Sequence, residues 1–293
     1  MDQAEQTPPD WLAIGAVGAL VVTWGSAFAL TDVALTGFGP LAVVSARAGL
    51  AAFVLCLAAL LTEQGLPRTV EHWVWCGVIG ITSLALPFTL LTWAQLTVDS
   101  TLAAILISGG PLFVLIFARL ILGTPLTLRR VLGFVVGLAG LVVLIGPGAL
   151  SGLGGDVLAQ LACLGTAACY AFSSVLVKRM PPVAPIPATA ASQLTAALII
   201  LPFGGTAFAT EFAVGPALLA LVVLGCIQTG AAQLLRFWTV RRAGPVFMAS
   251  VSYLIPVWAG FVGVAFLGET ITPSLVIGFA LIISGLLVAR PGR

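Results

Sequence analysis

Apolar residues along this chain occur in long continuous runs, separated by short breaks of Gly, Pro and charged residues. A run of about 20 apolar residues, as a helix rising about 1.5 Å per residue, can cross a hydrocarbon core of about 30 Å. The runs lack the apolar–polar alternation of membrane strands, so the pattern predicts membrane helices. The breaks delimit ten predicted spans, at residues 11–34, 39–61, 72–97, 100–122, 128–146, 156–178, 187–209, 214–238, 244–267 and 272–290.

The composition agrees with a membrane protein. The 293 residues are 60% hydrophobic and 8% charged, whereas soluble domains are about 45–50% apolar and about 25% charged. The five cysteines lie within apolar runs, with no CxxC pair and no His nearby at ligand spacing. We therefore expect an all-α membrane protein with no disulfide, metal or cofactor.

The basic residues test the number of spans, because Lys and Arg are retained on the cytoplasmic side of a membrane. Eleven of the twelve fall after an even-numbered span, whereas the ends of odd-numbered spans carry acids only. This distribution predicts ten spans with both termini in the cytoplasm. The eleven residues are Arg68, Arg119, Arg129, Arg130, Lys178, Arg179, Arg236, Arg241, Arg242, Arg290 and Arg293.

The two halves of the chain repeat each other. A shift of 145 residues gives ten identities within positions 111–143, among them Pro111 with Pro256 and Gly133 with Gly278. The predicted domains are thus two repeats, residues 11–146 and 155–290, with five spans each. Because five is odd, the second repeat enters the membrane from the opposite side, which predicts an inverted repeat and transport by alternating access.

Five features of the sequence carry a resemblance: "WGSAF" at 24–28, Arg47, "GD" at 155–156, "YA" at 170–171 and "LGETIT" at 267–272. In these residues the chain resembles the drug/metabolite transporter superfamily, specifically its EamA branch. The resemblance implies a carrier or exporter of metabolites, including amino acids, with a cavity formed by the first four spans of each repeat. In size and layout the chain is similar to exporters of aromatic and other neutral amino acids.

One departure from that pattern concerns Glu269. The first repeat has "LGTPLT" at 122–127 where the second has "LGETIT", so Glu269 has no acidic counterpart.

Two prolines interrupt the fourth and ninth spans. Pro111 and Pro256 each lack an N–H and clash with the carbonyl four residues earlier, which frees that carbonyl within the membrane. We predict paired hinges facing a central cavity, formed by Gly109, Gly110, Pro111 and Pro256. The alternative is that the prolines only curve two packed helices.

Arg47 is the one charged residue well inside a span. Burial of an Arg in a bilayer is unfavourable by about 2.5–3.5 kcal/mol or more, so its side chain should face the protein interior. It could bind a substrate carboxylate, or it could extend to helix-end carbonyls. A shift of 146 residues places Gln193 at the equivalent position of the second repeat.

Further neutral polar and aromatic residues accompany Arg47 near the interrupted helices. Such a lining suits a small amphipathic solute, although packing is the alternative for each aromatic residue. The predicted cavity residues are Trp24, Arg47, Ser83, Ser108, Tyr170, Gln193, Gln228, Ser252 and Tyr253.

The fifth and tenth spans are rich in glycine, with Gly133, Gly137 and Gly140 in one and Gly278 and Gly285 in the other. Such residues permit close helix approach. The sequence leaves open whether they pack within the protein or between molecules.

The first hypothesis for function is an inner-membrane exporter of small metabolites, most simply amino acids, acting as a monomer or weak homodimer without a nucleic-acid partner. No Asp or Glu lies at mid-span, so facilitated transport without ion coupling is expected. The alternatives are a multidrug or nucleotide-sugar transporter and, from other classes, a membrane enzyme or receptor. We expect no enzyme, because GxSxG, HExxH and paired intramembrane carboxylates are absent from the sequence.

Overall fold

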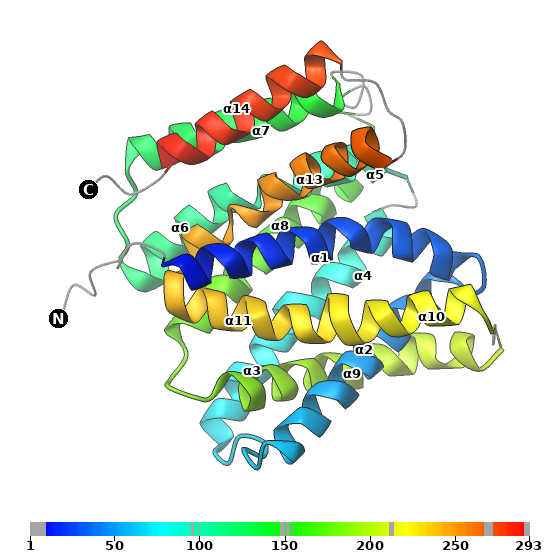
Figure 1. The fold of residues 1–293 in the computed structure, drawn as a ribbon. Helices are drawn as coiled ribbons and strands as arrows, with labels where there is room; N and C mark the ends of the chain where they lie inside the picture. The colour runs from blue at the N-terminus through cyan, green and yellow to red at the C-terminus, as the bar shows by residue number, and fades with distance from the viewer. Residues whose placement is uncertain are drawn as a thin grey trace. The chain divides into compact units, whose positions relative to one another are not determined.

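The structure is a computed structural model and describes residues 10–94, 97–98, 100–146, 150, 153, 155–210, 214–266 and 272–289. These residues form helices and the turns between them (Figure 1). Glu269, Arg290 and Arg293, which the sequence singled out, lie outside the described residues, as does most of "LGETIT".

Ten apolar helical segments are present in the described part of the chain. Seven are long and apolar enough to cross a bilayer by length and composition, and three shorter apolar helices accompany them. The predicted all-α membrane fold with ten spans is confirmed. The spans are α1 (Trp11–Leu35), α2 (Pro40–Leu61), α3–η1–α4 (Val70–Gly80, Ile81–Ala85, Leu86–Ala94), α5–α6 (Ser100–Ile107, Gly110–Leu122), α7 (Leu128–Ile145), α8 (Val157–Arg179), α9 (Pro185–Thr210), α10–η3–α11 (Pro216–Val223, Leu224–Ala231, Ala232–Ala243), α12–α13 (Pro245–Met248, Val251–Phe266) and α14 (Pro273–Ala289).

Polar residues at the breaks set the helix ends. The Thr69 and Thr127 side chains accept the backbone N–H groups of His72 and Arg130 at the starts of α3 and α7, which satisfies donors that a helix start leaves free. Gly123 ends α6 with φ of 71°, a left-handed conformation that glycine adopts without strain.

Contacts between helix ends agree with the span count. A count of ten spans puts eight of the contacting residues at one and the same membrane face. There, one ion pair and three hydrogen bonds join helix ends in pairs: Arg242 with Asp10, Lys178 Nζ with Arg241 O (2.8 Å), Arg129 Nε with Val288 O (2.8 Å) and His72 Nε2 with Pro182 O (3.3 Å). At the opposite face, Thr97 Oγ1 donates to Asp156 Oδ2 at 2.8 Å. The assignment of the first face to the cytoplasm stays a prediction.

The helices group into two compact units that cut across the sequence repeats. Unit 1 comprises Met1–Val21, Leu90–Lys178 and Thr239–Arg293, and unit 2 comprises Val22–Thr89 and Arg179–Trp238. Each unit therefore combines spans from both repeats.

Within unit 1, α7 and α14 lie side by side through their glycines (Figure 1). A Cβ added at Gly133 would lie 2.6 Å from the carbonyl oxygen of Gly285, and one added at Gly140 would lie 2.9 Å from that of Gly278. Backbone atoms thus occupy the space that side chains would need. Of the two alternatives left open by the sequence, the structure shows these glycines packing inside the protein.

Within unit 2, α2 packs along α9. Small buried residues form this interface, including Ala48 and Ala52 of α2 with Ala197 of α9, and a Cβ added at Gly204 would overlap the backbone of α2 at Leu41. A Cβ added at Gly225 in η3 would overlap the Leu50 side chain of α2, and one added at Gly80 of α3 would overlap the backbone of α9 at Ser192. The third and eighth spans are therefore held closely against the α2–α9 pair.

Candidate functional site

Two stretches of π-helix mark the same position in the two repeats. They are η1 in the third span and η3 in the eighth, both in unit 2. The 145-residue shift takes Ser83 of η1 to Gln228 of η3, and both side chains are buried. Because π-helical turns are rare and occur frequently at functional sites, η1 and η3 direct attention to these residues.

The chain around η3 is fixed by long-range hydrogen bonds. Trp24 of α1 donates its indole N–H to the carbonyl oxygen of Gln228 at 3.0 Å. Arg47 of α2 donates its Nε–H to Thr229 Oγ1 at 3.2 Å, and the Thr229 hydroxyl donates to Leu224 O at 2.8 Å. Three predicted cavity residues, Trp24, Arg47 and Gln228, are thus brought together by two consecutive residues of η3.

The Arg47 side chain also contacts an aromatic ring. Its guanidinium carbon lies 5.5 Å from the centroid of Phe88 in α4, a geometry that attracts a cation to the ring face. Arg47 therefore faces protein groups of unit 2, as predicted for a charge inside a span.

Unpartnered polar atoms are concentrated in unit 2. Ser45 Oγ, Gln193 Oε1 and Gln228 Oε1 are buried without a hydrogen-bond partner, and these residues are at most 5% exposed. An unsatisfied buried acceptor is unfavourable by about 1–3 kcal/mol, so each such group in a folded protein calls for an explanation.

Gln193 occupies a packing position. Its spacing of three residues from Ala190 and four from Ala197 places it on the same face of α9, and both alanines pack in clusters with residues of α2. Gln193 is thus a polar residue within the α2–α9 interface. Arg47, its repeat equivalent, contacts η3 instead.

The remaining predicted cavity residues belong to unit 1. Ser108 is buried and donates to Ala104 O at 2.8 Å within its own helix, while Tyr170 and Ser252 are half-buried. Tyr253 is completely buried and donates its O–H to Phe134 O at 3.0 Å, and a Cβ added at Gly137 would lie 3.1 Å from its ring. This position makes Tyr253 a packing residue between α13 and α7.

The two interrupted spans differ from each other. The fourth span breaks at Ser108 and Gly109, and Gly110 and Pro111 form the first turn of α6, where a proline needs no N–H. The ninth span breaks at Ala249 and Ser250, whereas Pro256 lies inside α13. The expected symmetry of the two prolines is therefore not reproduced in the positions of the breaks.

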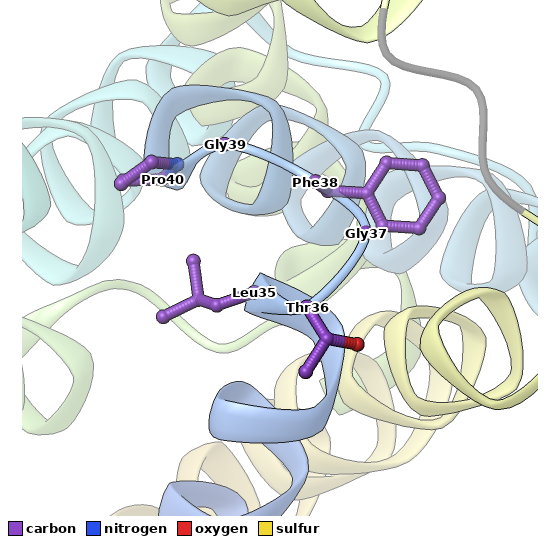
Figure 2. Close-up of a pocket in the computed structure, with 6 residues that line it drawn as sticks. All are labelled: Leu35, Thr36, Gly37, Phe38, Gly39 and Pro40. Atoms are coloured by element: carbon purple, nitrogen blue, oxygen red, sulfur yellow. The ribbon is translucent and has the colours of Figure 1, made fainter.

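A hollow of about 510 Å³ lies at the connection of α1 and α2. Its lining is Leu35, Thr36, Gly37, Phe38, Gly39 and Pro40, and Figure 2 shows Phe38 pointing away from Leu35 and Pro40. Thr36 supplies the one polar side chain of this lining, and none of the predicted cavity residues belongs to it. The hollow is therefore not the candidate site.

Titratable groups at the helix ends are stabilised in their charged form. The Arg242 side chain, followed by the backbone N–H of Ala13, holds the pKa of Asp10 below its ordinary value. The backbone N–H of Ala159, followed by the Thr97 hydroxyl, lowers the pKa of Asp156 in the same way. Within the described residues, no group of three His, Cys, Asp or Glu side chains could hold a metal ion.

Comparison with solved structures supports the fold. A crystal structure of a protein that shares 23% sequence identity superposes with a TM-score of 0.78, covering 94% of this chain and 96% of the other. This likeness extends across both units of the chain.

Comparison with known sequences adds the family. The chain is 26% identical over 285 residues to the uncharacterized inner membrane transporter YedA of Escherichia coli (strain K12), covering 95% of this chain and 90% of the relative. It is also 26% identical over 281 residues to a probable terminal-alkyne amino-acid exporter of Streptantibioticus cattleyicolor, covering 94% and 92%. The model of the EamA-like transporter family matches residues 11–146 and 155–290. Since these matches cover most of its length, the chain belongs to the EamA-like transporter family.

Proposed function

We propose that this membrane transporter exports small neutral amino acids across the inner membrane by facilitated, alternating access. The family assignment supports transport, and one relative is named as an amino-acid exporter and another as an inner membrane transporter. The observation that carries the substrate class is the pairing of a guanidinium with neutral polar groups around η3, within otherwise apolar spans.

In this proposal, Arg47 and Trp24 bind different parts of the substrate. Arg47 attracts the substrate carboxylate, because a guanidinium in a low-dielectric site binds that group by charge-assisted hydrogen bonds. Trp24 offers an aromatic surface for the side chain of the substrate. The breaks at Ser108–Gly109 and Ala249–Ser250 supply bends about which spans could move between outward-open and inward-open states.

Transport is proposed to be uncoupled from protons. A proton-coupled carrier generally uses an ionisable group inside the membrane, and the sequence places no carboxylate at mid-span. A pH gradient imposed alone across a liposome membrane should therefore not drive uphill accumulation of substrate, and accumulation under that condition would contradict this part of the proposal.

The orientation follows from the charge distribution, with both termini proposed in the cytoplasm and the protein acting as a monomer or weak homodimer. In a variant whose five native cysteines are replaced by Ala, labelling of a cysteine introduced at Gln3 by a membrane-impermeant maleimide reports the side of the N-terminus. Labelling of intact cells would contradict the proposed orientation.

The function itself is tested by counterflow in proteoliposomes loaded with a panel of amino acids, cationic drugs and nucleotide sugars. The expected result is exchange of neutral amino acids, and a weaker substrate affinity in Arg47→Gln. Protein-free liposomes provide the control. Exchange confined to cationic drugs or to nucleotide sugars would replace the amino-acid assignment by that of the transported class.

A further inference from the structure

The side-chain oxygen of Gln228 in unit 2 is buried and has no hydrogen-bond partner in the fold. The residue is 5% exposed. Its main-chain carbonyl, by contrast, accepts the Trp24 indole N–H. The backbone at Gln228 is thus held in place while a buried acceptor is left open.

The neighbouring residue is fixed as well. Thr229 accepts the Arg47 Nε–H and donates to Leu224 O, so a positive charge lies next to the residue that follows Gln228. Groups that are oriented before a ligand arrives bind it without further ordering, which favours affinity and specificity. The arrangement around Gln228 has this property.

We propose that Gln228 Oε1 is a substrate subsite that accepts an N–H of the substrate ammonium group, while Arg47 attracts the carboxylate of the same molecule. This assignment rests on the proposed function and narrows it to zwitterions. A free amine meets the charge of Arg47 without a compensating carboxylate. A simple carboxylic acid leaves the Gln228 oxygen unpaired, and a site with an unpaired buried polar group discriminates strongly against such an analogue.

The two repeats place different polar groups at equivalent positions around the subsite. Ser83 stands at the position in η1 that corresponds to Gln228, and Gln193 at the position in α9 that corresponds to Arg47. Gln193 lies on the face of α9 that packs on α2. One repeat therefore contributes the charge and the other the open acceptor, which suits a substrate with two different polar ends.

The test compares Gln228→Met with the wild type in proteoliposomes. Met keeps the length of the side chain but removes the acceptor. For L-phenylalanine, the competitors are 3-phenylpropionate, which lacks the amine, and phenethylamine, which lacks the carboxylate. In the wild type, L-phenylalanine should compete best. In Gln228→Met its KM should rise about ten-fold or more, as expected for loss of a hydrogen bond to a charged group, while inhibition by 3-phenylpropionate should be unchanged.

Thermal stability separates this role from a structural one. Because the Gln228 oxygen makes no hydrogen bond in the fold, Gln228→Met should melt at or above the temperature of the wild type. Gln160→Met in α8 of unit 1 is the matched control and should leave KM unchanged. An unaltered KM for phenylalanine in Gln228→Met would overturn the assignment. So would an equal loss of affinity for 3-phenylpropionate and for phenethylamine together with a lower melting temperature.

Failure of the proposed function gives a different result. If the wild type exchanges no amino acid of the panel, both the function and this subsite are wrong. If the wild type exchanges amino acids and Gln228→Met does so with the same KM, only the subsite is wrong.

Discussion

The packing of α7 against α14 can be tested at Gly133. An ideal Cβ added there would lie 2.6 Å from both the backbone nitrogen of Ala289 and the carbonyl oxygen of Gly285. This is 0.8 Å short of the 3.4 Å at which ordinary contact begins. Both obstacles are backbone atoms of α14, so Gly133→Ala can be accommodated only if the two helices move apart.

The size of the effect follows from two opposing terms. Overpacking a well-packed interface is destabilising by about 1–3 kcal/mol, whereas replacing a helical Gly by Ala stabilises by about 0.5–1 kcal/mol. We expect a net loss of about 1–2 kcal/mol. At about 2–4 °C per kcal/mol, this lowers the melting temperature by several degrees.

The assay is thermal unfolding of the purified protein in detergent, followed by intrinsic tryptophan fluorescence. Gly15→Ala and Gly18→Ala are matched controls, because an added Cβ at either position of α1 meets nothing within 4 Å. Both controls should melt at or above the wild-type temperature. A Gly133→Ala protein as stable as these controls would refute the close packing of α7 and α14.

Three further predictions concern individual side chains. Tyr253→Phe should lose about 0.5–1.5 kcal/mol, because it removes the O–H that donates to Phe134 O; a changed substrate KM at an unchanged melting temperature would contradict the packing role. Asp10→Asn should melt below the wild type at pH 7. Since Arg242 lowers the Asp10 pKa from 3.8, the stabilisation is complete above that value and is lost as pH falls through the lowered pKa, so the difference in melting temperature between the two proteins should shrink and then vanish as the solution is acidified below 3.8. Gln193→Leu should keep or raise the melting temperature, because the Gln193 oxygen has no partner in the α2–α9 interface; a marked loss of stability would show that this amide supports the fold.

The spans and their ends could be predicted from the sequence because hydrophobic runs and breakers determine them locally. The predicted second span, 39–61, and α2 (Pro40–Leu61) differ by one residue at the start. Arg47 and Gln228 could also be predicted as candidate site residues, because a charge or an amide inside an apolar run is conspicuous without any structure.

Other features depend on long-range packing and could not be derived from local patterns. The π-helical turns of η1 and η3 leave the apolar composition of their spans unchanged, so no local signal revealed them. The position of Tyr253 near Pro256 predicts a cavity residue, whereas its hydroxyl donates to a carbonyl oxygen 119 residues away in sequence. The break of the ninth span likewise precedes Pro256, at Ala249 and Ser250.

The interleaving of the repeats has a consequence for biosynthesis. Helix α2 is made with the first half of the chain, but its neighbour α9 belongs to the second half, and α7 must likewise await α14. A nascent first half therefore resides in the bilayer with its glycine and alanine surfaces still exposed to lipid, until translation of the second half delivers their partners. Neither half expressed alone can assemble a complete unit, whereas the two halves produced together from separate messages have every surface needed to recombine.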